Sequence, residues 1–105
     1  MKREEVYKLI DDERDYQDLK WCSTTTSSGG HHYTPEEWIT YMEDYLAEAK
    51  HSLSRETHVI SYMKAMSAIR KVTALGVAAM EHIPTPSREE EKVQTQKWAT
   101  KIKNE

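Results

Sequence analysis

Apolar residues along this chain recur at the three- and four-residue spacing of an amphipathic helix, and they do not alternate as they would in a strand. Three long segments share the helical spacing: residues 3–21, 34–54 and 59–83. Residues 22–33 (CSTTTSSGGHHY) are rich in Ser, Thr and Gly without periodicity, which predicts a loop. The pattern therefore predicts an all-α fold, an antiparallel helical bundle of three core helices.

The second segment has the clearest start signal. Thr34 is a preferred N-cap residue, Pro35 suits the first helical position, and Glu37 completes a capping box. An apolar stripe follows, formed by Ile39, Met42, Leu46, Ala49 and Leu53 and widened by Trp38, Tyr41 and Tyr45. The segment is predicted to be a helix with one face in the core.

The third segment is apolar nearly all round from Ala68 to Met80. A helix without a clear polar face is typical of a central position or of an oligomer interface. Pro84 and Pro86 end the pattern, because proline cannot continue a helix.

A last helix is predicted from Ser87 to about Lys103, with a second capping box closed by Glu90. Its large apolar side chains are Val93, Trp98 and Ile102. The chain is thus divided into a helical core domain, 1–83, and a C-terminal helical arm, 84–105. The arm either docks on a neighbouring subunit through Trp98 and Ile102 or is solvated.

Composition narrows the function classes. With 105 residues the chain forms one domain with a limited core, for which assembly into a homo-oligomer is a common remedy. The net charge of −3 argues against a dedicated binder of duplex nucleic acid, which needs a basic face. No apolar run is long enough to span a membrane. A single cysteine and the lack of a signal-peptide pattern lead us to expect a cytoplasmic protein.

Polar residues interrupt the apolar stripe of the first segment. After Val6, Leu9 and Ile10, helical steps reach Glu13, Tyr16, Gln17 and Lys20. Buried polar groups are normally paired, so these side chains either emerge into solvent, find structural partners, or line a polar pocket at one end of the bundle.

Charged residues of the other two segments suggest what such a pocket would hold. Asp44 and Glu48 lie one helical turn apart, a spacing that suits Mg²⁺ but is equally common on a solvated acidic face. Lys64, Arg70 and Lys71 either pair with these carboxylates or hold phosphates.

Three motifs carry a resemblance to a known family: ERDYQDLKW at 13–21, WITYMEDYLAEA at 38–49 and IRKVTALGVAAME at 69–81. Together they resemble the small phage and bacterial MazG-like proteins, relatives of the all-α nucleoside triphosphate pyrophosphatases, over residues 3–83. The resemblance implies an oligomeric helical bundle with a nucleotide pocket between helices. In catalytic members it implies acidic residues on two successive helices that hold Mg²⁺.

The chain departs from the family on the third helix. Asp44 and Glu48 match the acidic motif of the second helix, with Glu43 as the alternate. Where the family has further acids, this chain has Ala68, Arg70 and Lys71. Metal-assisted phosphate chemistry needs enough carboxylates to hold the cations, whereas Arg and Lys bind phosphate directly. We therefore expect the pocket to be retained and the hydrolysis to be lost.

Three hypotheses follow. The first is a MazG-like oligomer that binds a nucleotide without cleaving it, such as a phage anti-defence protein that sequesters a nucleotide second messenger. Its predicted ligand contacts are Lys20, Arg70 and Lys71 to phosphates, Trp21 to the base, and Glu13, Gln17 and Tyr45 around them. The second is a Mg²⁺-dependent nucleoside triphosphate pyrophosphatase with Asp44 and Glu48 as metal ligands. The third is a structural or protein-interaction module that acts through its arm.

Overall fold

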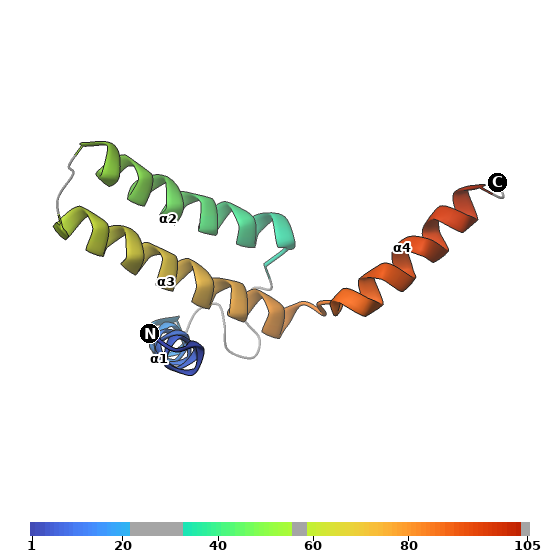
Figure 1. Ribbon diagram of the computed structural model, residues 1–105, viewed down its shortest axis with the longest axis horizontal. Coiled ribbons are helices and arrows are strands. Elements are labelled where there is room, and N and C mark those ends of the chain that lie inside the picture. The colour runs from blue at the N-terminus through green and yellow to red at the C-terminus, as the bar shows by residue number, and fades with distance from the viewer. Residues whose placement is uncertain (22–32, 56–58, 104–105) are drawn as a thin grey trace.

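The computed structural model describes residues 1–21, 33–55 and 59–103, and these residues form four helices and no strand (Figure 1). The helices are α1 (Arg3–Trp21), α2 (Pro35–Arg55), α3 (Val59–His82) and α4 (Arg88–Lys103). The predicted all-α class is confirmed, and each helix begins and ends within one or two residues of its predicted bounds. The predicted loop 22–33 lies outside the described residues except for Tyr33.

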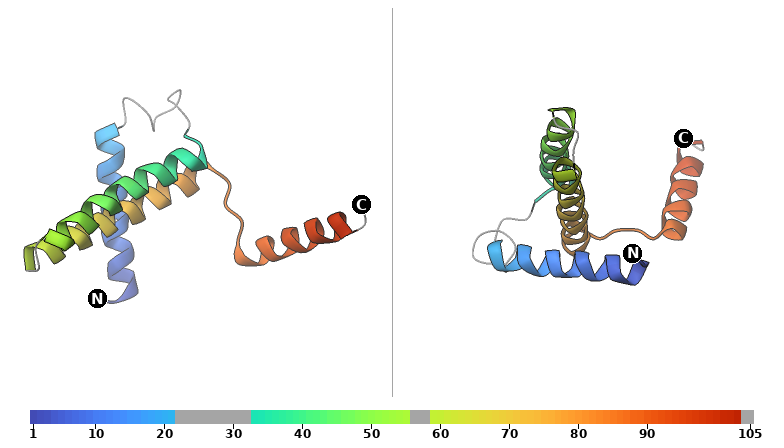
Figure 2. Two further views of the ribbon diagram at one scale, coloured as in Figure 1. Left: turned by 90° about the horizontal axis from the view of Figure 1, so that it is seen from above. Right: turned by 60° about the vertical axis from the view of Figure 1, so that its left-hand side comes forward.

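Helix α3 is central. It packs against α2 along one side and against α1 on the other, whereas the backbones of α1 and α2 do not come close to each other. Figure 1 shows α2 and α3 side by side, running in opposite directions, and Figure 2 shows α1 crossing α3 at a steep angle. A central α3 agrees with its nearly uniform apolar sequence. Of the described core helices, only α2 and α3 run antiparallel side by side, and α1 crosses this pair (Figures 1 and 2). An antiparallel bundle that includes all three core helices therefore stays a prediction.

Local hydrogen bonds fix the helix starts as the sequence indicates. Thr34 N donates to Glu37 Oε1 at 3.0 Å, and Glu37 N donates to Thr34 Oγ1 at 3.2 Å, so both halves of the first capping box are formed. At the start of α4, Glu90 N donates to Ser87 Oγ at 3.1 Å. These bonds satisfy backbone N–H groups that have no partner within the helix.

The core is small and is built on one face of α3. Trp38 of α2 is 5% exposed and packs with Leu75 and Ala78 of α3. The Trp38 ring also stacks on His82, with centroids 6.2 Å apart and an interplanar angle of 13°. The other buried residues of α3 are small: Ser61, Ala65, Ala68 and Ala74. Small side chains let neighbouring helices approach closely, but they bury little apolar area each.

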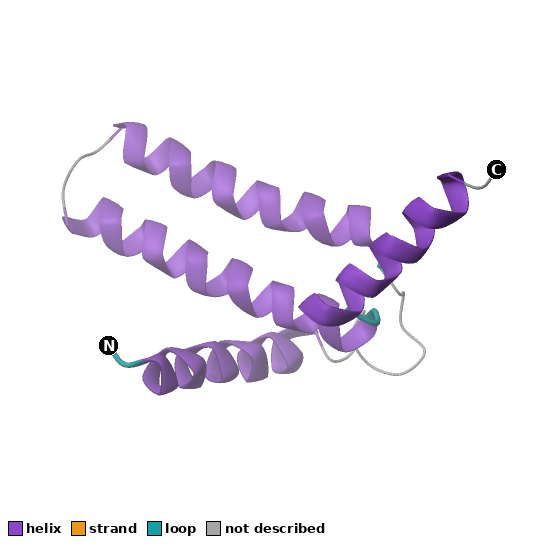
Figure 3. Cartoon of the chain, turned by 45° about the vertical axis from the view of Figure 1, so that its right-hand side comes forward, coloured by secondary structure: helices purple, strands orange, loops and turns teal. Residues whose placement is uncertain are grey.

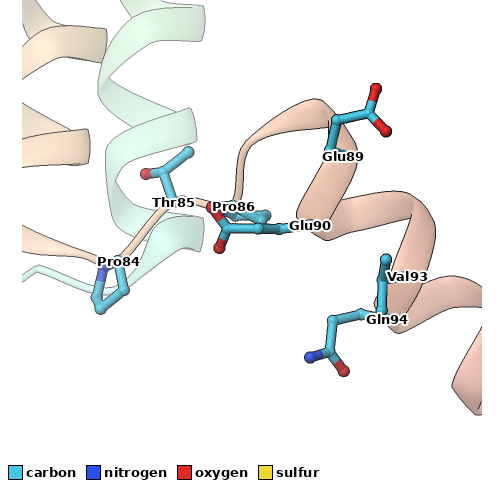
Figure 4. A pocket seen from close by; sticks show the side chains of 7 residues that line it. All are labelled: Pro84, Thr85, Pro86, Glu89, Glu90, Val93 and Gln94. Carbon is cyan, nitrogen blue, oxygen red and sulfur yellow. The ribbon is translucent and has the colours of Figure 1, made fainter.

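Helix α4 projects away from the other three helices and packs against none of them (Figures 1 and 2). Figure 3 shows that the described part of the chain consists of helices and short loops. An open groove of about 540 Å³ lies at the bend before it, lined by Pro84, Thr85, Pro86, Glu89, Glu90, Val93 and Gln94 (Figure 4). The two prolines end α3 and direct the chain outward, because their rings prevent a continuous helix.

The chain is extended for its size. Its radius of gyration is 17.7 Å, whereas a compact domain of this length has about 13 Å. Its accessible surface is 8667 Å², against about 6,100 Å² expected for a folded monomer of 12.3 kDa. Many large apolar side chains consequently remain in contact with solvent, on all four helices.

None of the described helices has the length and apolar character needed to cross a membrane.

The small core makes one residue critical for stability. We expect Trp38→Ala to lower the free energy of unfolding by about 3–5 kcal/mol, since it removes the largest side chain of the core and leaves a cavity. Urea denaturation followed by circular dichroism measures this loss. Ile39→Ala, on the next residue and 53% exposed, serves as the matched control. Equal effects of the two substitutions would contradict the assigned core.

Candidate functional site

The face of α1 that meets α3 is polar in its second half. Glu13, Arg14 and Gln17 turn inward there, with Ile10 before them and Trp21 after them. The prediction that polar residues occupy the inner face is confirmed for Glu13 and Gln17. Lys20, which was expected to face inward, is exposed. The inner face is rotated by about one position toward Arg14, because this residue finds two carboxylate partners at the crossing.

Arg14 is the centre of the crossing, and its residue is only 6% exposed. Its guanidinium bonds Asp18 one turn further along α1 at 2.5 Å and Glu81 on α3 at 2.6 Å. Burial lowers the pKa of Arg14, but the hydrogen bonds to Glu81 and Asp18 outweigh this effect and raise it above its ordinary value. Arg14 therefore stays charged and ties the second half of α1 to the end of α3.

A second ion pair joins the same helices. Arg70 Nε donates to Glu13 Oε1 at 2.7 Å, and another guanidinium nitrogen of Arg70 donates to Ser67 Oγ at 3.2 Å. The Glu13 side chain is 9% exposed, so its charge needs this partner. Arg70 is thus engaged within the chain.

Gln17 links the two helices through the backbone. It is 3% exposed, and its Nε2 donates to the backbone carbonyl of Lys71 at 3.2 Å. Its Oε1 atom, like Nε of Arg14, has no hydrogen-bond partner among the described residues. The crossing is therefore held by polar contacts, and Glu13, Gln17 and Arg70 all have structural roles in it.

A separate pocket of about 190 Å³ lies between α2 and α3. Its lining from α2 is Tyr45, Glu48, Ala49 and Ser52, and its lining from α3 is Lys64, Ser67, Ala68 and Lys71. Both sets repeat at i, i+3, i+4 and i+7, so each is one face of its helix. The space exists because the contact between α2 and α3 (the α2–α3 seam) is formed by Ala and Ser side chains here. Further along the seam, Trp38 and Leu75 fill the corresponding space.

The residues that line this pocket carry more positive than negative charge. They include two lysines, two serines and a tyrosine, and one acidic residue, Glu48. Lys71 is half-buried and Lys64 is exposed. Lysine and hydroxyl side chains are the residue types that bind anions. Of the predicted ligand contacts, Tyr45 and Lys71 lie here, together with Glu48 from the predicted metal pair.

Two predicted ligand contacts lie elsewhere. The ring of Trp21 packs against the core cluster of Trp38, Leu75 and Ala78. Lys20 Nζ stands over that ring, 5.9 Å from its centroid, within the range of a cation–π contact. Neither residue lines the α2–α3 pocket, so the structure separates the seven predicted contacts into a pocket group, a crossing group and this pair.

The predicted metal ligands are only partly brought together. Glu48 lines the pocket, whereas Asp44 is exposed one turn away on α2 and does not line it. Across residues 1–21, 33–55 and 59–103, no three His, Cys, Asp or Glu side chains are grouped closely enough to hold a metal ion.

Sequence reasoning missed Arg14 and the two pocket serines, Ser52 and Ser67. Arg14 lies one position off the extrapolated stripe, and its partner Glu81 is far along the chain. Helical periodicity could have found the two serines. Ser52 shares one face of α2 with Tyr45 and Ala49, and Ser67 shares one face of α3 with Lys64 and Lys71. Periodicity alone does not show that these two faces oppose each other.

Comparison with models of protein families, with curated proteins and with solved structures finds no match to this chain.

The crossing is testable through Arg14. We expect Arg14→Ala to lower the free energy of unfolding by about 1–3 kcal/mol, the range for hydrogen bonds to charged groups. The loss is below that of a fully buried pair because Glu81 and Asp18 remain half-exposed to water. Lys8→Ala, which breaks the exposed pair with Asp12, is the control and should cost less than about 1 kcal/mol. Chemical denaturation compares the two, and equal losses would refute the role of Arg14.

Proposed function

We propose that the protein is a homo-oligomeric helical protein that binds a nucleotide through its phosphate groups in the α2–α3 pocket, without hydrolysing it. The observation that carries this proposal is the convergence of Lys64, Lys71, Ser52 and Ser67 on one cavity. Ammonium and hydroxyl groups are donors that phosphate oxygens accept. The nucleotide class comes from the resemblance to MazG-like proteins, which covers both helices of the pocket.

The size of the pocket supports recognition of the phosphate end of such a ligand. Sites that enclose a whole small molecule have about 300–1,000 Å³, whereas this cavity has about 190 Å³. A phosphate or diphosphate group fits a space of that order, and the rest of the nucleotide would extend outward past Tyr45. An aromatic ring there offers a stacking surface for a base.

Binding without cleavage is favoured by the charges at the pocket. Glu48 is the one carboxylate that lines it among the described residues, and Lys71 occupies a position where the resemblance implies an acid. Arg70, the other such position, is held by Glu13. Metal-assisted hydrolysis needs several carboxylates with open metal positions, and direct binding by lysine needs none. Sequestration of a nucleotide second messenger, as in phage anti-defence, is one use of such binding.

Assembly into oligomers is supported by the exposed apolar face of α3. Val59, Tyr62, Met63, Met66 and Ile69 share one face of its first half, and each is at least 46% exposed. Helical steps of three and four residues join them into one stripe. Such a contiguous patch marks an interface, and the accessible surface exceeds that of a monomer by an amount typical of a large interface.

Ligand binding is testable by thermal stabilisation, because a ligand that binds the native state raises its stability by mass action. We expect one member of a panel of linear and cyclic nucleotides to raise Tm of the purified protein. Lys71→Glu and Lys64→Glu should each abolish the shift, since each places a negative charge in the pocket. Lys92→Glu, the same change on α4 and away from the pocket, should leave it intact.

If no nucleotide of the panel raises Tm, the proposed function is wrong. If Mg²⁺-dependent release of pyrophosphate accompanies binding and Glu48→Gln stops it, the protein is instead a pyrophosphatase.

Oligomerisation is testable by native mass spectrometry. We expect a mass that is a multiple of 12.3 kDa, together with any ligand that co-purifies. Met66→Glu should shift the population toward monomer, because it places a charge within the apolar stripe. Ala47→Glu, at an exposed position of α2, is the matched control. A wild-type mass of one chain at micromolar concentration would refute the assembly.

A further inference from the structure

The C-terminal helix carries an apolar surface that its own chain does not cover. Trp98 is 68% exposed, and Val93 and Ile102 are about half exposed. No other described helix packs against α4. A tryptophan left in water at mid-helix is unusual unless it serves an interface.

Val93 and Trp98 belong to one face of α4, and Ile102 lies next to it. Glu90, Val93, Gln94, Lys97, Trp98 and Lys101 follow one another at steps that return to the same side of a helix. Two open hollows lie along it: Glu90, Val93 and Gln94 line one, and Gln94, Lys97, Trp98 and Lys101 line the next. We call these six residues the α4 face.

Charge is polarised along the α4 face. Glu90 lies at its first end, whereas Lys97 and Lys101 lie in its second half; the cations of the first half, Arg88 and Lys92, lie on the opposite side of the helix. The helix dipole favours this order along the axis. It does not account for Glu90 sharing one face with Lys97 and Lys101. When two copies of such a face meet in antiparallel orientation, the acidic end of each lies against the basic end of the other.

We propose that α4 pairs in antiparallel orientation with α4 of a second copy of this chain, through the α4 face. A two-fold axis between Thr95 and Gln96 sets Glu90 of each copy against Lys101 of the other. The same register sets Val93 against Trp98 of the other copy, which removes both apolar side chains from water. A parallel pairing would set like charges against each other.

The charges determine the orientation, and the apolar contacts supply the attraction. Exposed ion pairs contribute little to affinity, but like charges in the wrong orientation oppose association. A helix of 16 residues is about 24 Å long. It presents less surface than the roughly 800 Å² per partner of a standard interface, so the pairing is reversible. This proposal does not depend on nucleotide binding.

Disulfide trapping tests the orientation in the full-length chain. Cys22→Ser is the background for two variants, Glu90→Cys and Lys101→Cys, which carry tags of different mass. Under a mild oxidant we expect a cross-link when the two variants are mixed and at least about tenfold less in either one alone. In an antiparallel pair two copies of residue 90 are about 16 Å apart along the axis. Rapid cross-linking of Glu90→Cys with itself, or no cross-link in the mixture, would overturn the proposal.

Charge exchange tests the contact itself, in the same trapping assay on full-length chains. Association is measured by the disulfide yield between two cysteine variants, Gln94→Cys on one chain and Lys97→Cys on the other, which lie opposite each other near the proposed two-fold axis. Glu90→Lys alone or Lys101→Glu alone should reduce this yield about tenfold, and Glu90→Lys with Lys101→Glu in one chain should restore it. Lys92→Glu, which reverses a lysine off the α4 face, should leave the yield unchanged. Failure of the double variant to recover would show that Glu90 and Lys101 do not face each other.

Discussion

The close approach of two helices to opposite sides of α3 is the constraint on which the structure depends. Its buried residues are nearly all small: Ser61, Ala65, Ala68, Ala74 and Ala78. Small side chains allow backbones to come near each other, but each buries little apolar area. The α2–α3 seam is therefore anchored at one end by Trp38 and leaves an open pocket further along, where no large side chain fills it.

The scarcity of large apolar side chains in the core also explains why α1 contacts α3 through polar side chains. Because α3 offers α1 few large apolar side chains, Arg14 and Glu13 hold it through ion pairs with Glu81 and Arg70. Such pairs require defined geometry but add little net stability once desolvation is counted. The small core leaves apolar side chains on α3 and α4 exposed, and these are the surfaces through which we propose that copies of the chain associate.

The candidate site was partly predictable. The positions of Tyr45, Glu48 and Lys71 on two helical faces follow from periodicity, and all three line the pocket. The ion pair of Arg70 with Glu13 was not predicted: the sequence suggested Asp44, Glu48 or phosphates as partners of Arg70. Glu13 and Arg70 are 57 residues apart, so tertiary packing alone brings them together. Trp21 is partly buried against the core cluster and does not line the pocket, because the end of α1 lies near the Trp38 end of the contact between α2 and α3.

Sequence by itself determined the helices and their starts, because capping, proline and apolar periodicity are local properties of the chain. It left α3 as either a central helix or an interface helix. It also left open whether the polar residues of α1 are buried or in solvent, and it did not show the rotation that brings Arg14 inward. Only the tertiary structure decided which polar groups pair with each other and which line the pocket between α2 and α3. Those outcomes depend on the angle at which α1 crosses α3 and on which faces of α2 and α3 oppose, and helical periodicity carries no information about either.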